Sequence, residues 1–238
     1  MDKSQSSFII LGVSIFLGLA VLGYLLGDAA ISYKEYERTV TVKGLSEQEH
    51  MADIVIWPIQ FTEASNNLEE IYVSLENSSS TIKAFLIEQG IDEDEISTDS
   101  PVVTDKSAQR YGGEADPEFR YVATQIVTVY SREVEQIRAI MKELAELGKQ
   151  GIVLGGENYQ TQTEFLFTSL NEIKPQMIEE ATKEARQVAS KFAEDSNSEL
   201  GKIKTAYQGQ FSISPRDNNN PHIKKVRVVS TVVYYLSD

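Results

Sequence analysis

Few side chains in this sequence are suited to chemistry, and the two histidines are the most conspicuous. His50 and His222 could bind a metal as neutral imidazoles, but zinc sites place histidines a turn apart on a helix or beside cysteines. Here the two lie far apart in the chain, each in a polar connection, and there is no cysteine. We therefore expect both histidines at the surface and no metal-ligating residues.

Motifs for catalysis are also lacking in the sequence. The chain contains no G-x-S-x-G nucleophile elbow, no G-x-x-x-x-G-K-[ST] phosphate loop and no G-x-G-x-x-G dinucleotide motif. The composition leaves a Ser-His-Asp triad open, and 36 acidic residues make any carboxylate pair uninformative. Without cysteine there are no disulfides, thiolate metal sites or cysteine nucleophiles. We expect no catalytic or cofactor-binding residues, no cofactor and no enzymatic activity.

The acidity of the chain limits its partners. Its 238 residues carry a formal net charge of −14, with a pI near 4.7. Such a surface repels phosphate backbones and anionic headgroups, so nucleic acid is not an expected partner. The main basic cluster is Lys224, Lys225 and Arg227, which we expect to blunt a sheet edge or to pair with acids.

The N-terminal region contains an apolar segment of membrane length. Phe8 to Gly27 is twenty residues without a charge, a proline or an amide side chain. As a helix with a rise of about 1.5 Å per residue, it spans roughly 30 Å, the thickness of a bilayer's hydrocarbon core. The sequence therefore predicts a tail at 1–7, a transmembrane signal anchor at 8–27, a linker at 28–37 and one domain at 38–238.

Cleavage of this segment is the alternative to an anchor. Gly27-Asp28-Ala29 offers a small-x-small site, which would release the domain to the periplasm after Ala29. The apolar run is longer than the roughly 7–15 residues of a signal peptide, which favours the anchor. We expect a single-pass protein of the bacterial inner membrane, with its C-terminal domain in the periplasm or outside.

The rest of the chain predicts an α+β domain. Segments with the period-two pattern of strands alternate along it with segments that have the spacing of helices. We therefore expect a two-layer domain, with helices packed on a largely antiparallel sheet. The expected strands are 38–43, 52–63, 95–104, 119–130, 159–168, 202–214 and 224–236, the last two forming a hairpin. The expected helices are 66–90, 131–148 and 171–196.

Individual residues set the expected boundaries. We expect Gly44 to end the first strand, Pro58 to mark a bulge or a sheet edge, and Asn66 to cap the first helix. The acidic run Asp92 to Glu95 lacks the ligand spacing of a calcium loop and is expected to be a solvated turn. The most irregular stretch is the loop at 105–118, with its Gly-Gly and Asp-Pro pairs.

The last helix has a narrow apolar stripe rich in alanine, and small residues let a helix lie close on a sheet. We expect that stripe to comprise Ile173, Met177, Ala181, Ala185, Val188 and Phe192.

Short motifs in this order resemble the SIMPL-domain (DUF541) family of bacterial envelope proteins, including the 26–28 kDa periplasmic immunogens. The resemblance covers about residues 38 to 236. The motifs are Val42-x-Gly44, Ala52-Asp53, Gly90-Ile91, Glu95-Ile96-x-Thr98, Arg120-Tyr121-x-Ala123, Gly148 with Gly151, Phe165-x-Phe167, Glu180-Ala181, Ala185, Ala189 and Leu200-Gly201. The sequence departs from the family in its long apparent anchor and in Pro58.

The resemblance implies an envelope-located α+β domain, an association with stress tolerance and ring-like oligomers, with no catalytic residues to carry over. We expect a membrane-tethered extracytoplasmic protein that acts by protein–protein interaction or as a homo-oligomer. The alternatives are an extracytoplasmic hydrolase or small-ligand-binding protein with a cleft near the 105–118 loop, and a pore-like assembly.

Overall fold

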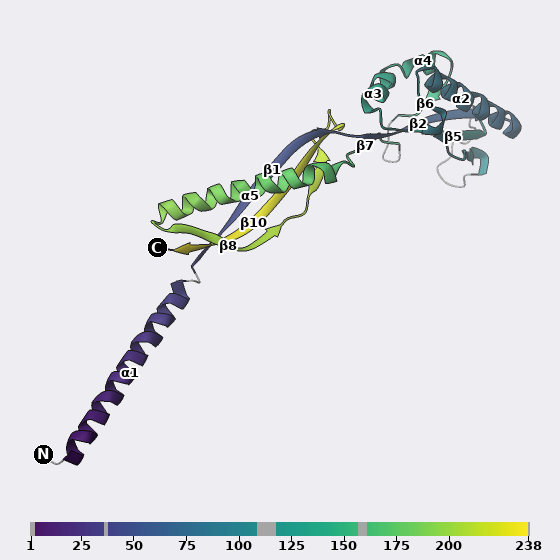
Figure 1. The fold of residues 1–238 in the computed structure, drawn as a ribbon. Coiled ribbons are helices and arrows are strands. Elements are labelled where there is room, and N and C mark those ends of the chain that lie inside the picture. The colour runs from purple at the N-terminus through teal and green to yellow at the C-terminus, as the bar shows by residue number, and fades with distance from the viewer. Residues whose placement is uncertain (1–2, 36–37, 109–117, 157–160, 238) are drawn as a thin grey trace. The chain divides into compact units, whose positions relative to one another are not determined.

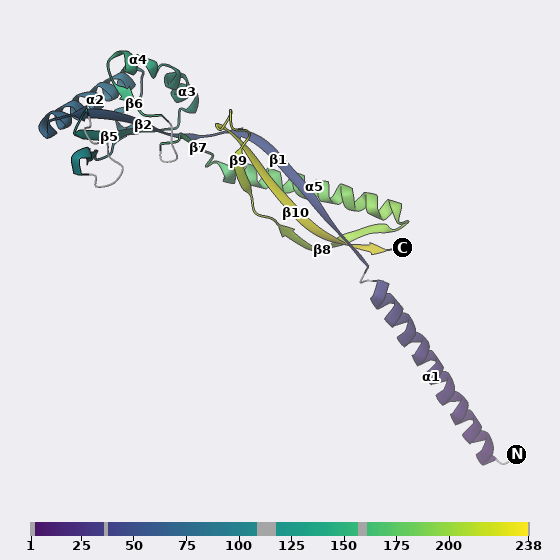
Figure 2. The same ribbon diagram turned by 180° about the vertical axis from the view of Figure 1, so that it is seen from behind.

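The computed structural model describes residues 3–35, 38–108, 118–156 and 161–237. Within it the chain forms two compact units (Figures 1 and 2). Unit 1 comprises Met1–Glu47, Ile173–Ser212 and Arg227–Asp238, and unit 2 comprises Gln48–Glu172 and Ile213–Val226. The α+β class with antiparallel strands is confirmed, and the strands are divided between two sheets.

The chain begins with one long helix, α1 (Lys3–Glu35). Its segment Leu11–Ile31 is long and apolar enough to cross a membrane, with a mean hydropathy of 1.9. None of this segment is buried within the protein. The helix includes the expected span and continues through residues 28–35 of the expected linker. No glycine or proline follows Gly27 in this stretch, so nothing in the local sequence ends the helix there.

The sheet associated with unit 1 has the strand order β1 (Thr39–Met51), β10 (Ile223–Ser237), β8 (Glu199–Gln208), and β9 (Ser212–Pro215) also pairs with β10. The predicted C-terminal hairpin is confirmed, because β8 and β10 pair antiparallel. The first strand is longer than expected: Gly44 does not end it, and the stretch expected to be a polar connection, residues 45–51, continues β1.

Helix α5 (Leu170–Asp195) covers this sheet through small side chains. Its buried residues recur every four positions: Met177, Ala181, Ala185, Ala189 and Ala193. The expected alanine-rich stripe is confirmed at Met177, Ala181 and Ala185. Ile173 and Val188 are half-buried and Phe192 is 56% exposed, and the inward positions of the last turns belong to Ala189 and Ala193. The cluster beneath contains Val42 of β1 with Val232 and Tyr234 of β10.

The contact at Gly44 explains why the side chains on the buried face of α5 must be small. A Cβ added to Gly44 would overlap the carbonyl oxygen of Ala181 and the amide nitrogen of Ala185, so β1 and α5 are in backbone contact there. Two residues further on, the buried Ser46 donates its hydroxyl to Glu180 Oε2 at 2.8 Å. Glycine therefore permits the close approach, where the sequence alone suggested a strand end.

Unit 2 contains the second sheet, in the order β3 (Ile96–Thr98), β5 (Tyr121–Ser131), β2 (Ile54–Ser65), β6 (Val153–Leu154). In addition, β4 (Val102–Asp105) pairs with β5 and β7 (Glu164–Leu166) with β2. Helices α2 (Leu68–Glu88), α3 (Val134–Lys142) and α4 (Ala145–Lys149) contribute to one core with the sheet. The 3₁₀ turns are η1 (Glu93–Glu95) and η2 (Lys106–Ala108).

Pro58 lies inside β2, which is a central strand. Pairing with β5 is unbroken through Pro58 and Thr128, so there is no bulge on that side. On the other side, β7 pairs with residues 54–56 and β6 with residues 61–62. The Gln60 carbonyl accepts a hydrogen bond from the Gly155 amide on that side, at 2.7 Å. Pro58 lies two residues before Gln60 in the strand, so its backbone N and C=O face the same side. Its missing N–H therefore falls in the gap between two partner strands, a local edge.

Several expected boundaries differ from the structure. The N-cap of α2 is Asn67, whose side chain accepts from the Glu69 amide at 2.8 Å, rather than Asn66. The expected helix 131–148 is divided into α3 and α4, and Ser131 accepts from the Glu133 amide just before α3. The expected strand 95–104 is two short strands. The acidic run ends in η1, confirming the turn, and residues 157–160 lie outside the described chain.

We predict that Gly44→Ala destabilises the protein, because the added methyl group meets backbone atoms that cannot rotate away. The expected loss in free energy of unfolding is about 1–3 kcal/mol, the usual cost of overpacking. Gly148→Ala is the matched control: it lies in α4 with open space around it and should raise stability by about 0.5–1 kcal/mol. Urea unfolding of the detergent-solubilised chain measures both, and equal stabilities would contradict the backbone contact.

Candidate functional site

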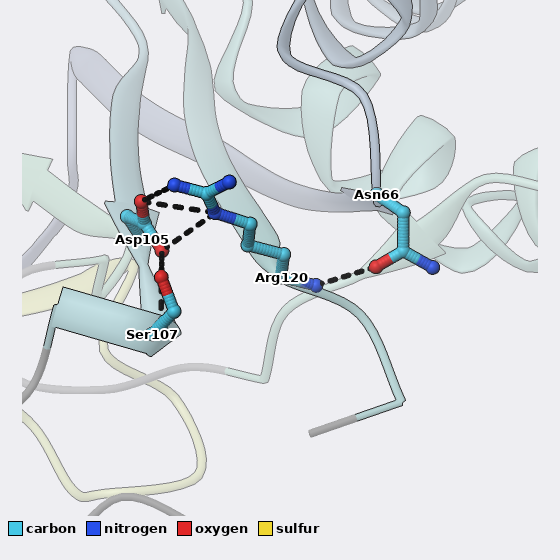
Figure 3. A network of polar contacts seen from close by, with 4 residues as sticks. All are labelled: Asn66, Asp105, Ser107 and Arg120. Atoms are coloured by element: carbon cyan, nitrogen blue, oxygen red, sulfur yellow. Dashed lines mark hydrogen bonds and ion pairs between the residues drawn. The ribbon is translucent and has the colours of Figure 1, made fainter. Parts of the chain in front are cut away.

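The loop expected to border a cleft is held at its base by an ion pair (Figure 3). Arg120, just before β5, points its guanidinium at Asp105, the last residue of β4. Arg120 Nη2 and Nε donate to Asp105 Oδ2 at 2.9 and 3.2 Å. Residues 109–117 of this loop lie outside the described chain, so the expected cleft falls largely outside it as well.

Two further side chains complete this clamp. Ser107 donates its amide and its hydroxyl to Asp105 Oδ1 at 2.9 and 2.6 Å. Asn66 accepts from the Arg120 amide at 2.9 Å (Figure 3). It also donates its side-chain amide to the Glu118 carbonyl at 3.2 Å. This is the role of Asn66 in place of the expected helix cap. The clamp thus joins the start of α2 to both ends of the loop.

The charges of the clamp residues are suited to a structural role and not to proton transfer. Hydrogen bonds from Arg120 and then from Ser107 lower the pKa of Asp105 from 3.8 to about 2, and the same pairing raises the pKa of Arg120. A carboxylate with so low a pKa is a poor base at neutral pH, and both of its oxygens are already engaged. The clamp therefore fixes the loop ends in place.

The two histidines pack against aromatic rings in and just after β7. His50 is half-buried and stacks on Phe167 with ring centroids 5.2 Å apart, and His222 is 5% exposed with its ring edge-on to Phe165 at 6.0 Å. The expected surface position is wrong for His222. Burial, followed by the charge of Arg138, lowers its pKa, which favours the neutral ring.

No candidate metal centre is formed by the described acidic and histidine side chains. Within the described ranges, no group of three or more is close enough to hold a metal ion. Asp53 instead holds the backbone just ahead of α5: its carboxylate accepts from the amides of Thr168 and Ser169 at 2.8 Å. Burial alone would raise the pKa of Asp53, but these amides lower it overall. The Ala52-Asp53 motif thus has a structural role.

The basic cluster lies on a central strand. Because β10 runs between β1 and β8, the expected edge-blunting role is wrong. The expected pairing with acids is confirmed for Arg227, whose Nε lies 3.9 Å from Glu47 Oε2. Lys224 is buried, which lowers its pKa, and Glu164 partly offsets that effect.

A second feature, which was not predicted from the sequence, is the exposed edge strand β8 of the unit 1 sheet. Every residue of β8 except Leu200 is exposed, including Ile203 and Tyr207 at 48% and 66%. Between β8 and α5 there is an open hollow of about 700 Å³. We call this hollow and the free edge of β8 the β8 groove. Its lining includes Lys183 and Arg186 of α5, Lys202 and Ile203 of β8, and Tyr234 of β10.

The fold defines an α+β protein with an N-terminal apolar helix, and its described residues contain no group of acidic and histidine side chains that could hold a metal ion. The SIMPL family model, described as a protein of unknown function (DUF541), matches residues 40–233, so the chain belongs to this family. No curated protein matches the chain. The family and the N-terminal helix fit an extracytoplasmic, membrane-tethered protein.

We predict that the Asp105 carboxyl titrates near pH 2 and that Arg120→Gln moves it back toward 3.8. Because the folded pKa lies below the unfolded one, the clamp contributes fully above about pH 4 and is lost as the pH falls toward 2. Carboxyl NMR on labelled protein measures both midpoints. Arg138→Gln, which does not contact Asp105, is the control, and a wild-type midpoint near 3.8 would contradict the paired geometry.

Proposed function

We propose that this SIMPL protein is a non-enzymatic, membrane-tethered component of the bacterial envelope that works through protein–protein contacts. In this proposal α1 stays in the inner membrane as an anchor and residues 38–237 lie in the periplasm. The length of the apolar segment supports the anchor. The family resemblance supports an extracytoplasmic setting and a role in stress tolerance.

The observation that carries this proposal is the exposure of β8. A strand at the end of a sheet presents unpaired N–H and C=O groups, and native proteins usually cover or shorten such edges. Here the strand runs ten residues with nearly all of them exposed, beside an open hollow. Apolar side chains at such an edge are characteristic of surfaces that bind other proteins.

Assembly with further copies of the chain is one form of this function. The resemblance supports ring-like oligomers, and such a ring would give the pore-like assembly a structural basis. Tethering to one membrane restricts copies to a plane and raises their effective concentration, so a modest contact suffices.

We predict that Tyr207 lies in a contact surface outside the cytoplasm. The chain has no cysteine, so Tyr207→Cys and the control Tyr130→Cys each carry one thiol, at positions 66% and 50% exposed in the wild type. A membrane-impermeant maleimide should label both variants in spheroplasts. A thiol-to-amine cross-linker should give higher-mass adducts from Tyr207→Cys alone.

The adduct mass identifies the partner, since a doubled mass indicates a second copy and another mass a different protein. Unlabelled thiols in intact spheroplasts that become reactive after lysis would contradict the extracytoplasmic placement. Equal cross-linking from the two positions, or none from either, would contradict a contact function of β8.

A further inference from the structure

The β8 groove differs in charge from the chain that carries it. The whole protein has a net charge of −14, yet the hollow is lined by Lys183, Arg186 and Lys202 against a single acid, Glu179. Lys204 lies on the same strand, above the ring of Tyr235 at 5.4 Å. A local basic surface on an acidic protein favours a negatively charged partner at that place.

The backbone of β8 leaves hydrogen-bonding groups free along its outer edge. Gly209 N donates to Val229 O at 2.9 Å, and the register pairs Tyr207 with Thr231. In an antiparallel ladder the inward and outward amides alternate, so those of Ala206 and Gln208 face away from β10. No other strand of the described chain pairs with this edge.

The side of β8 that faces α5 is also accessible. The register aligns Ile203 with Tyr234, and both line the hollow with the aliphatic parts of Lys183 and Lys202. Tyr234 itself is buried, whereas Ile203 is 48% exposed. A strand added beside β8 would therefore place one row of its side chains over the apolar surface of Ile203 and Tyr234. The basic groups of Lys183, Arg186 and Lys202 surround that surface.

We propose that the β8 groove binds an extended acidic peptide segment of another protein as an added strand. Its backbone pairs with the outward groups at Ala206 and Gln208. Acidic side chains contact Lys183, Arg186 and Lys202, and an aliphatic side chain covers Ile203. This inference rests on the proposed contact function and specifies the chemistry of its partner.

Charge distinguishes this partner from a second copy joined edge to edge. Two β8 strands paired with each other would bring Lys202 and Lys204 of one copy close to those of the other. Like charges facing across a strand pair are destabilising, so the edge disfavours its own copy while it attracts acids. The same lysines protect the free edge from aggregation.

The test uses two synthetic octapeptides and the full chain in detergent micelles. The peptide VTETVTET places valine and glutamate on one strand face, and VTKTVTKT replaces each glutamate by lysine. Isothermal titration calorimetry should show the acidic peptide binding at least tenfold more tightly. The double variant Lys183→Glu with Lys202→Glu should reverse that preference.

A matched pair of variants tests the added strand itself. Ala206→Pro removes an outward N–H without breaking a bond to β10, and Ala206→Val keeps that N–H. We expect at least a tenfold loss of peptide affinity in the proline variant and affinity near wild type in the valine variant. Circular dichroism confirms that both variants are folded.

Equal affinity for the two peptides, or equal affinity of the two Ala206 variants, would overturn the proposal. If that result accompanies undiminished cross-linking from Tyr207→Cys, the contact function stands and the acidic-strand inference fails. If cross-linking is also lacking, the contact function itself fails.

Discussion

The backbone contact between β1 and α5 at Gly44 is the constraint on which unit 1 depends. The helix can approach so closely only because the strand offers glycine and the helix offers alanine at every fourth position. Such a helix buries little apolar surface for each residue, so its contact with the sheet must be tight to be stabilising. The hydroxyl of Ser46 on Glu180 adds a polar bond beside the contact.

This placement of α5 has a consequence for the rest of the sheet. The alanine-rich face packs on β1 and β10, and β8 contributes only the half-buried Leu200 to that cluster. In Figures 1 and 2 the helix runs beside β1 and β10, and β8 forms the border of the sheet. The same close packing that stabilises unit 1 thus leaves one strand uncovered, and the long basic side chains of α5 reach into the space beside it.

Much of the fold follows from local sequence signals, and the errors have a common physical origin. Alanine spacing correctly predicted the buried face of α5, and Gly90, with a φ of 87°, ends α2 as expected. Gly44 was misinterpreted, and for Pro58 a bulge and an edge could not be distinguished, because both outcomes depend on distant partners: a helix at Gly44 and a gap between two partner strands at Pro58. Asn66 and Asn67 are equivalent as local caps, and the distant partners of Asn66, Glu118 and Arg120, distinguish them.

The sites were less accessible to sequence reasoning than the fold. The Asp105–Arg120 pair had a weak signal in the sequence, opposite charges at the two ends of an irregular loop. The buried His222 packs against Phe165 of β7, which is distant in the sequence. The free edge of β8 could not be predicted, because the strand's alternation is compatible with a central position. The edge is free because β10 pairs with only one side of β8 and α5 leaves a hollow beside it.

Hydrogen–deuterium exchange of single amides in the β8 strand tests the central claim most directly. In the detergent-solubilised chain, Thr205 and Tyr207 should be protected by β10, and Ala206 and Gln208 should exchange at rates near those of an unstructured peptide. That alternation would show that β8 has a free edge available to a partner. Equal protection of all four amides would show that the edge is already covered and would contradict the account.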